Sequence, residues 1–259
     1  MKHSFLDRYS DRDSVIHRLD PRGKLLVAFA FIAAVVLTPF GSWLAYGLYF
    51  AVIAVLIALS RLPVSHFIKR SLVIIPFVLL VAAFIPFFRE GEVAGSYNLW
   101  LWQVSVTHSG LQVLWNIMIK AWLSILSLIL LTSTTSFNNI LKGLEQLRMP
   151  KVMVMIMSFM YRYIFLLTDE VMRMKQARDS RNFGGGRKLW QIGTVGSMIG
   201  TLFIRSYERG ERVYASMVAR GFDGHIRTLK RLYFSQRDAV FVAILGTVLV
   251  SICLFNLLY

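Results

Sequence analysis

Two stretches of the sequence carry arginine beside small or polar residues, and arginine is well suited to hold a carboxylate on another protein. The stretches are Ala177-Arg178-Asp179-Ser180-Arg181-Asn182-Phe183 and Ala219-Arg220-Gly221-Phe222. A guanidinium group can form two parallel, charge-assisted hydrogen bonds to a carboxylate, with a geometry that lysine lacks. The stretches lie about forty residues apart. Two such stretches therefore indicate two similar contacts with a partner that is itself paired.

Each of these stretches follows a segment whose charge pattern is typical of an exposed helix. Before the second stretch, charges of both signs recur at spacings of three and four residues, at Arg205, Glu208, Arg209, Glu211 and Arg212. Gly221 is expected in the left-handed position after the helix, and Arg220 lies where the helix dipole favours a cation. A basic residue followed by glycine is also an ordinary way for a helix to stop, so one such end alone does not indicate function.

No other group of residues predicts catalysis or metal binding. The five histidines have no pair at i, i+3 or i+4, and the single cysteine, Cys253, is expected to be a small apolar residue in a membrane span. The run Gly184-Gly185-Gly186-Arg187-Lys188 lacks the spacing of a phosphate-binding loop and predicts a hinge between helices. Motifs of metalloproteases and serine hydrolases are absent from the sequence. We therefore expect no catalytic residue, no metal site and no cofactor on this chain.

Composition indicates that these residues belong to an integral membrane protein. The chain has 259 residues, of which 56% are hydrophobic and only 17% charged, with a net charge of +15. Residues 25–60 contain no charged side chain. A run of that length is twice the roughly 18 residues that indicate one spanning helix. We therefore expect spans at 25–40 and 43–60, separated by a break at Pro39-Phe40-Gly41-Ser42.

Three further apolar runs complete an all-α architecture of about five spans. They cover residues 71–88, 111–132 and 239–259. Pro76 and Pro86 in the first of these runs mark kinks or a helix end. Lys120, inside the second, is expected to snorkel to the outer interface, the alternative being a functional charge within the membrane. We divide the chain into 1–136, 137–236 and 237–259.

The placement of basic residues predicts the orientation, because Lys and Arg are retained on the cytoplasmic side. The first 24 residues hold six basic residues and the connection 61–70 holds three. The turn at 40–43 has none, and the connection 89–109 has one arginine, two glutamates, and Trp100 and Trp102, which suit an outer interface. These counts predict a prokaryotic cytoplasmic membrane protein with its N-terminus inside and its C-terminus outside.

Between the fourth and fifth spans lies a long basic segment. Residues 137–237 contain 18 of the 29 basic residues and seven acidic ones. Three helices are expected in it, at 138–148 before Pro150, at 151–181 and at 189–220. The stretch 152–168 is apolar, but Arg162 at its middle and its methionines favour a packing surface or an interfacial helix over a sixth span.

With these features the sequence resembles the transmembrane T component of energy-coupling factor transporters, and most of all the cobalt-type CbiQ branch. The resemblance covers essentially the whole chain. It is carried by Leu19-Asp20-Pro21-Arg22-x-Lys24 before the first span, by Leu147-Arg148-Met149-Pro150, and by the paired Ala-Arg ends. The Ser14-x-x-His17 spacing points to the cobalt branch.

The resemblance implies a scaffold subunit that is not an enzyme and does not bind substrate itself. Its arginine-tipped coupling helices would insert into grooves on two ABC ATPase subunits, similar to CbiO, which would bind ATP and Mg and hydrolyse the ATP. The membrane helices would hold a substrate-binding component similar to CbiM, with a small CbiN-like subunit as a possible addition. Arg220 matches the second coupling motif. Arg178 and Arg181 are both candidates for the first, with Arg181 preferred because Asp179 stands where glycine or serine is usual.

Alternative readings of the sequence differ in substrate or in class. Nickel or a vitamin could replace cobalt, since the coupling machinery is shared. A membrane-embedded enzyme is disfavoured by the missing catalytic motifs. A basic membrane anchor that binds anionic lipid or nucleic acid would lose affinity steeply with salt, whereas specific arginine tips would respond mainly to point substitutions. Our interpretation includes contact with membrane lipid but no nucleic acid.

Overall fold

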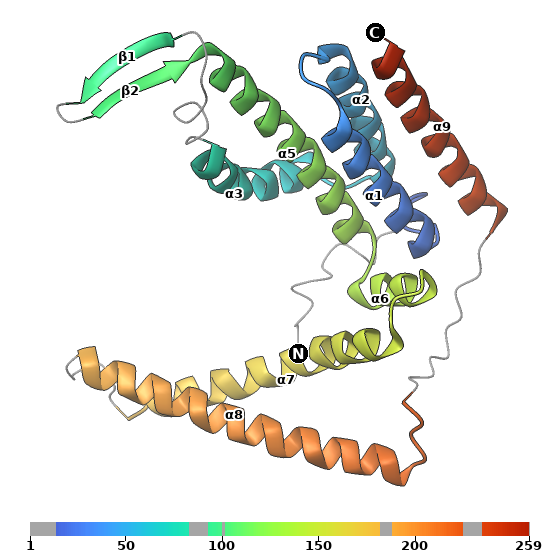
Figure 1. The fold of residues 1–259 in the computed structure, drawn as a ribbon. Coiled ribbons are helices and arrows are strands. Elements are labelled where there is room, and N and C mark those ends of the chain that lie inside the picture. The colour runs from blue at the N-terminus through green and yellow to red at the C-terminus, as the bar shows by residue number, and fades with distance from the viewer. Residues whose placement is uncertain (1–13, 83–92, 100–101, 182–187, 225–234, 259) are drawn as a thin grey trace. The chain divides into compact units, whose positions relative to one another are not determined.

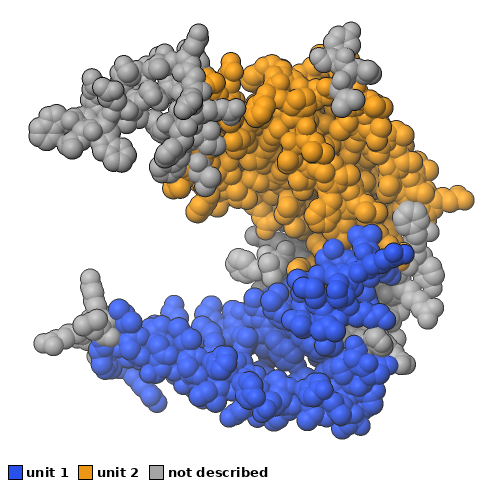
Figure 2. Space-filling model, viewed as in Figure 1, with its two compact units in different colours: residues 1–3, 144–231 blue, residues 4–143, 232–259 orange. Residues whose placement is uncertain are grey.

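A computed structural model describes residues 14–82, 93–99, 102–181, 188–224 and 235–258 (Figure 1). The elements follow one another as α1 (Pro21–Leu37), α2 (Trp43–Ser60), α3 (Val64–Ala82), β1 (Val93–Leu99), β2 (Trp102–Thr107), α5 (His108–Thr134), α6 (Phe137–Gln146), α7 (Lys151–Asp179), α8 (Lys188–Ala219) and α9 (Gln236–Leu258). The chain forms two compact units, residues 4–143 with 232–259 and residues 1–3 with 144–231 (Figure 2). We call them the membrane bundle and the paired-helix unit.

Helices α1, α2, α5 and α9 pack around the core of the membrane bundle, and α3 packs against α5 (Figure 1). Tyr49 lies fully buried at the centre, where its ring meets Phe31 edge to face at 5.6 Å. Its hydroxyl accepts a hydrogen bond from Thr38 Oγ1 at 3.4 Å, so the polar tip of this ring is satisfied. The outward faces of the same helices carry many exposed apolar side chains, as expected for a surface in contact with lipid.

The all-α prediction is confirmed, and the observed helices match most of the predicted spans. The bounds of α2 coincide with the predicted span 43–60, and α5 and α9 contain 111–132 and most of 239–259. Four described helices are long and apolar enough to cross a membrane: α2, α5 from residue 109, α7, and α9 as far as residue 256. α1 has 17 residues, at the lower limit for a span. Length and composition thus also admit α7, which we predicted not to span.

The structure between residues 64 and 107 differs from the sequence prediction. α3 begins at Val64, so it contains Lys69 and Arg70, which we had placed in the preceding connection, and Pro76 lies inside the helix. Pro86 and Trp100 lie outside the described residues. Where a loop was expected, β1 and β2 form an antiparallel hairpin with an irregularity between Val93 and Gly95.

Lys120, which we predicted to snorkel to the outer interface, has defined partners at the end of α1. Its ammonium group donates to the carbonyl oxygens of Val36 at 2.9 Å and Thr38 at 2.7 Å. These carbonyls belong to the end of α1, where no further turn of helix can satisfy them. Lys120 of α5 therefore caps α1, and Gly41, with φ of +90°, turns the chain into α2.

In the paired-helix unit, α7 and α8 pack against each other (Figure 1). Their bounds lie within two residues of the predicted helices 151–181 and 189–220. Large apolar side chains remain exposed on both, among them Ile156 and Met160 on α7 and Phe203 and Ile204 on α8. The predicted glycine hinge, Gly184-Gly185-Gly186, lies outside the described residues.

Replacing Lys120 by methionine should destabilise the membrane bundle, because two carbonyl groups at the end of α1 lose their donor. We expect a loss of about 1–3 kcal/mol in the free energy of unfolding, measured as a lower melting temperature in detergent. Lys69→Met, at an exposed position of α3, is the matched control. Equal melting temperatures for the two variants would contradict the capping role.

Candidate functional site

The second arginine-bearing end, at the C-terminus of α8, is closed by a complete capping motif. Phe222 N donates to Met217 O at 3.1 Å and Gly221 N donates to Val218 O at 2.9 Å. This pair of bonds defines the Schellman motif, and it requires a left-handed residue between them. Gly221 has φ of +77°, as predicted. The exposed Arg220 therefore sits at a sharply ended, fully capped helix terminus.

The first arginine-bearing end, at α7, has a different backbone. Ser180 continues in the right-handed helical region and its hydroxyl donates to Ala177 O at 2.9 Å. The guanidinium of Arg178 folds onto the neighbouring carboxylate, with Nη2 and Nε at 2.8 and 3.0 Å from Asp179 Oδ1. Arg181 follows as an exposed residue. Ala177 and Ala219 occupy equivalent places near the two ends, but only the α8 end carries a left-handed glycine among the described residues.

Glu170 joins the two long helices. Its two carboxylate oxygens accept from Arg173 Nη2 at 2.6 Å, on the same helix, and from Arg205 Nη1 at 2.7 Å, on α8. The hydrogen bonds from Arg173 and Arg205 lower the pKa of Glu170, which lies beyond the apolar stretch of α7. Because the carboxylate stays charged, the contact between α7 and α8 persists through the physiological pH range.

The N-terminal motif forms the start of α1. Asp20 is the N-cap residue, its Oδ1 accepts from Arg22 N at 2.8 Å, and Pro21 occupies the first turn, where a missing N–H costs nothing. Asp20 N in turn donates to Asp238 Oδ1 at 2.8 Å, a contact between residues 218 positions apart. Asp238 Oδ2 accepts from Ser235 N at 2.8 Å. One buried carboxylate therefore caps the starts of both α1 and α9.

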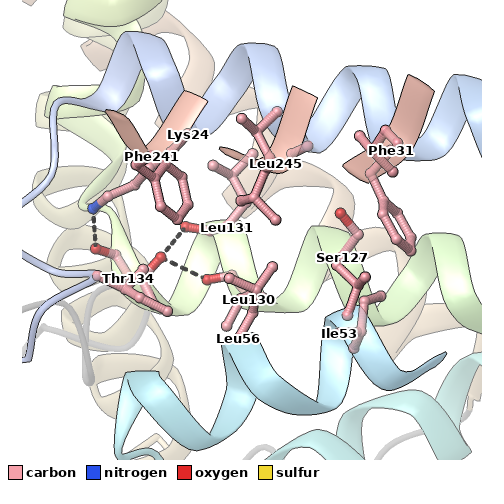
Figure 3. Close-up of a pocket in the computed structure, with 15 residues that line it drawn as sticks. Lys24, Phe31, Ile53, Leu56, Ser127, Leu130, Leu131, Thr134, Phe241 and Leu245 are labelled. Atoms are coloured by element: carbon pink, nitrogen blue, oxygen red, sulfur yellow. Dashed lines mark hydrogen bonds between the residues drawn. The ribbon is translucent and has the colours of Figure 1, made fainter. Parts of the chain in front are cut away.

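Lys24 is buried beside this carboxylate pair. Only 6% of the residue is exposed, and its ammonium group donates to His17 O, Thr134 O and Thr135 Oγ1 at 3.2–3.3 Å. Figure 3 shows the bond to Thr134. The carboxylates of Asp238 and Asp20 are close enough to act on it electrostatically. The three hydrogen bonds and the two nearby carboxylates reduce the cost of burying this charge. We call Asp20, Lys24 and Asp238 the charge clamp.

The rest of the N-terminal sequence supports the charge clamp. Ser14 Oγ bonds His17 Nδ1 at 2.7 Å, which shapes the turn whose carbonyl receives Lys24. A Cβ added at Gly143 of α6 would lie 2.8 Å from Leu25 Cδ1, and one at Gly23 would lie 3.0 Å from Val242 Cγ2. Glycine at these two positions allows α6 and α9 to approach the start of α1 closely.

The sequence analysis missed Asp238 and Ser235. Ser235-x-x-Asp238 just before an apolar run is the signature of a capping box, and it could have been recognised. The long-range bond to Asp20 has no local signal. Among the described residues no group of three or more His, Cys, Asp or Glu side chains could hold a metal ion. The sites are therefore built from hydrogen bonds and ion pairs, and they are suited to binding and to transmitting movement.

Comparison with known proteins finds similarity over most of the chain. Residues 12–231 match the family CbiQ, described as cobalt transport protein. The energy-coupling factor transporter transmembrane protein EcfT of Listeria innocua is 31% identical, with 86% of each chain covered. The EcfT protein of Lactococcus lactis is 28% identical, over 93% of this chain and 94% of its own. An uncharacterised protein of Methanocaldococcus jannaschii, MJ1571, is 26% identical over 92% of this chain and 82% of its own.

Asp238→Ala should destabilise the membrane bundle strongly, because it leaves the buried N–H of Asp20 and the N–H of Ser235 unpaired and removes a counter-charge of Lys24. We expect a loss of about 3 kcal/mol in the free energy of unfolding, measured by thermal unfolding in detergent. Glu208→Ala, which breaks an exposed ion pair with Arg212, is the control and should change the melting temperature little. An Asp238→Ala protein as stable as this control would refute the charge clamp.

Gly221→Ala should loosen the end of α8, because an alanine in the left-handed region costs about 1–2 kcal/mol. Amide hydrogen exchange at residues 221 and 222 should become faster. Gly210→Ala, in the middle of α8 with open space around the position, should slow exchange nearby instead, since alanine favours helix. The same effect from both substitutions would rule out a left-handed cap.

Proposed function

The chain belongs to the CbiQ family of cobalt transport proteins, and we propose that it couples ATP hydrolysis to import as the transmembrane component of an energy-coupling factor transporter. In this role it is a non-catalytic subunit, and partner ATPases hydrolyse the ATP. The membrane bundle supplies the spans, and the paired-helix unit supplies the contacts to the ATPases. The remaining question is which side chains of this chain carry the coupling.

The observation that best supports a coupling role is the capped end of α8. The Schellman motif fixes the backbone around Arg220 and leaves the side chain exposed at the tip of a 32-residue helix. Inserted into a groove, a guanidinium in this position could form paired, charge-assisted bonds to a carboxylate of an ATPase. A preordered end loses less conformational entropy on binding than a frayed one.

For the first coupling arginine, the geometry favours Arg181 over Arg178. The guanidinium of Arg178 is already bonded to Asp179, so binding to another carboxylate would require breaking that contact. Arg181 is exposed one residue beyond Ser180. We therefore propose Arg181 and Arg220 as the two coupling residues.

The contact between Glu170 and Arg205 supports a mechanism in which the two coupling helices move as a pair. When ATP draws two ATPase subunits together, each arginine-tipped helix would follow its own subunit. Because the ion pair between Glu170 and Arg205 joins α7 to α8, the two helices would rotate relative to each other about this contact. The movement would then pass along the chain into the spans and reorient a bound substrate component.

Cobalt ion is the substrate that we propose, on the description of the matching family. The ion would be bound by a separate membrane component similar to CbiM, with a CbiN-like subunit, and the ATPases would resemble CbiO. The relatives named EcfT carry no metal in their names, so nickel or a vitamin is the alternative substrate. The distribution of basic residues over the connections supports an orientation with the N-terminus in the cytoplasm and the C-terminus outside.

Charge reversal at the coupling arginines tests this proposal. Arg220→Glu and Arg181→Glu should each lose co-purification with the cognate ABC ATPase pair in detergent, because removing one partner of a buried ion pair costs about 2–5 kcal/mol. Arg178→Glu should retain the ATPases. Transport of substrate by the Arg220→Glu complex should be abolished while the variant protein remains folded.

The control is Arg162→Glu, at an exposed position of α7 remote in sequence from both ends. If Arg220→Glu still supports uptake at the wild-type rate, Arg220 is not a coupling residue. If the ATPases dissociate from all the arginine variants, and increasingly so as the salt concentration rises, the basic helices act as a non-specific anchor instead.

A further inference from the structure

A cavity separate from the two arginine-bearing helix ends opens at the edge of the membrane bundle. It has a volume of about 860 Å³ and is lined by residues of the N-terminal turn, the end of α2 and the start of α9. Three arginines line it, Arg18, Arg61 and Arg237, and all three are exposed. Apolar side chains of α9 form the other wall, including Val240 and Ile244, which are 56% and 57% exposed. We call this cavity the arginine groove.

The arginine groove lies at the boundary between polar and apolar sequence. Arg61 directly follows the uncharged run 25–60, and Arg237 precedes the uncharged run 239–259. Since α9 is long and apolar enough to cross a membrane, its first turns mark the membrane surface. The groove therefore presents cations at headgroup level and apolar walls at the level of the acyl chains.

The acidic residue in the groove does not neutralise it. Asp238 is buried, and its two oxygens are occupied by Asp20 N and Ser235 N. Its charge also acts on Lys24, which is buried on the same side of the bundle. Among the described residues that line the groove, three arginines stand against one carboxylate, so this lining carries a formal excess of positive charge.

The backbone at Arg61 adds an independent observation. Arg61 caps α2 in the left-handed region with φ of 54°, where glycine would be free of strain and an arginine is disfavoured. A strained residue at such a position is consistent with a role for its side chain. Arg61 is also one of the residues that line the groove.

We propose that the arginine groove binds an anionic phospholipid, with the phosphodiester held by Arg18, Arg61 and Arg237 and the acyl chains lying along Val240 and Ile244. Guanidinium groups form paired, charge-assisted bonds to phosphate oxygens, and basic pockets between membrane helices on the cytoplasmic side suit acidic headgroups. The apolar wall selects a lipid over a free anion, because only a lipid can cover it. This site is independent of the coupling ends and of the transported substrate.

The test is native mass spectrometry of the full chain in detergent, titrated with phosphatidylglycerol, with phosphatidylcholine of the same acyl chains, and with inorganic phosphate. Phosphatidylglycerol should bind at the lowest concentration. Joint replacement of Arg18, Arg61 and Arg237 by glutamine should weaken its binding by about tenfold or more, since each cation near an anionic lipid contributes about 1 kcal/mol. Joint replacement of Arg162, Lys175 and Arg212, three exposed cations of α7 and α8, should leave binding unchanged.

The variant Arg61→Gly distinguishes an effect on lipid binding from an effect on folding. Glycine relieves the left-handed backbone, so the melting temperature should stay equal or rise, while phosphatidylglycerol binding should weaken by about fivefold. Three outcomes would overturn the proposal: equal binding of phosphatidylcholine, displacement of the lipid by inorganic phosphate at similar concentration, or unchanged lipid binding in Arg61→Gly and the triple variant.

Discussion

The architecture of the membrane bundle depends on one buried interaction, the charge clamp of Asp20, Lys24 and Asp238. A lone buried charge would be costly, but here each charged group meets opposite charge or backbone dipoles. The cluster constrains the packing of two helices, because Asp238 reaches the N-terminus of α1 and that of its own helix together. The apolar core supplies most of the driving force for packing. The clamp sets the register in which α1 and α9 meet.

Residues 144–231 leave the membrane bundle after α6 and return to it at α9, and both of these helices contact the start of α1. On one side, Gly143 of α6 lies against Leu25 and the backbone of Pro21. On the other, Asp238 at the beginning of α9 holds Asp20. A movement that arrived through either connection would therefore reach the same few residues at the start of α1.

The sequence predicted well what depends on local pattern. An uncharged run and a Pro-Gly break were sufficient to place α2, and the Arg-Gly pair was sufficient to place Gly221 in its left-handed cap. Contacts with partners far along the chain were not predicted. Lys120 caps a helix that lies 82 residues earlier, and Asp238 joins a helix 218 residues away, and no spacing within either segment reveals those partners. We did not predict the hairpin, although polar and apolar residues alternate in 103–107, a pattern that is typical of a strand.

The long separation between Asp20 and Asp238 also bears on how the protein is made. During translation α1 emerges more than two hundred residues before α9. Until the final helix arrives, Asp20 and Lys24 lack the carboxylate that completes their cluster, and the early spans carry an incompletely matched cation at their edge. Closure of this part of the bundle thus requires α9. A ribosome product truncated before α9 would expose this defect to membrane quality-control proteases, which would distinguish it from the finished subunit.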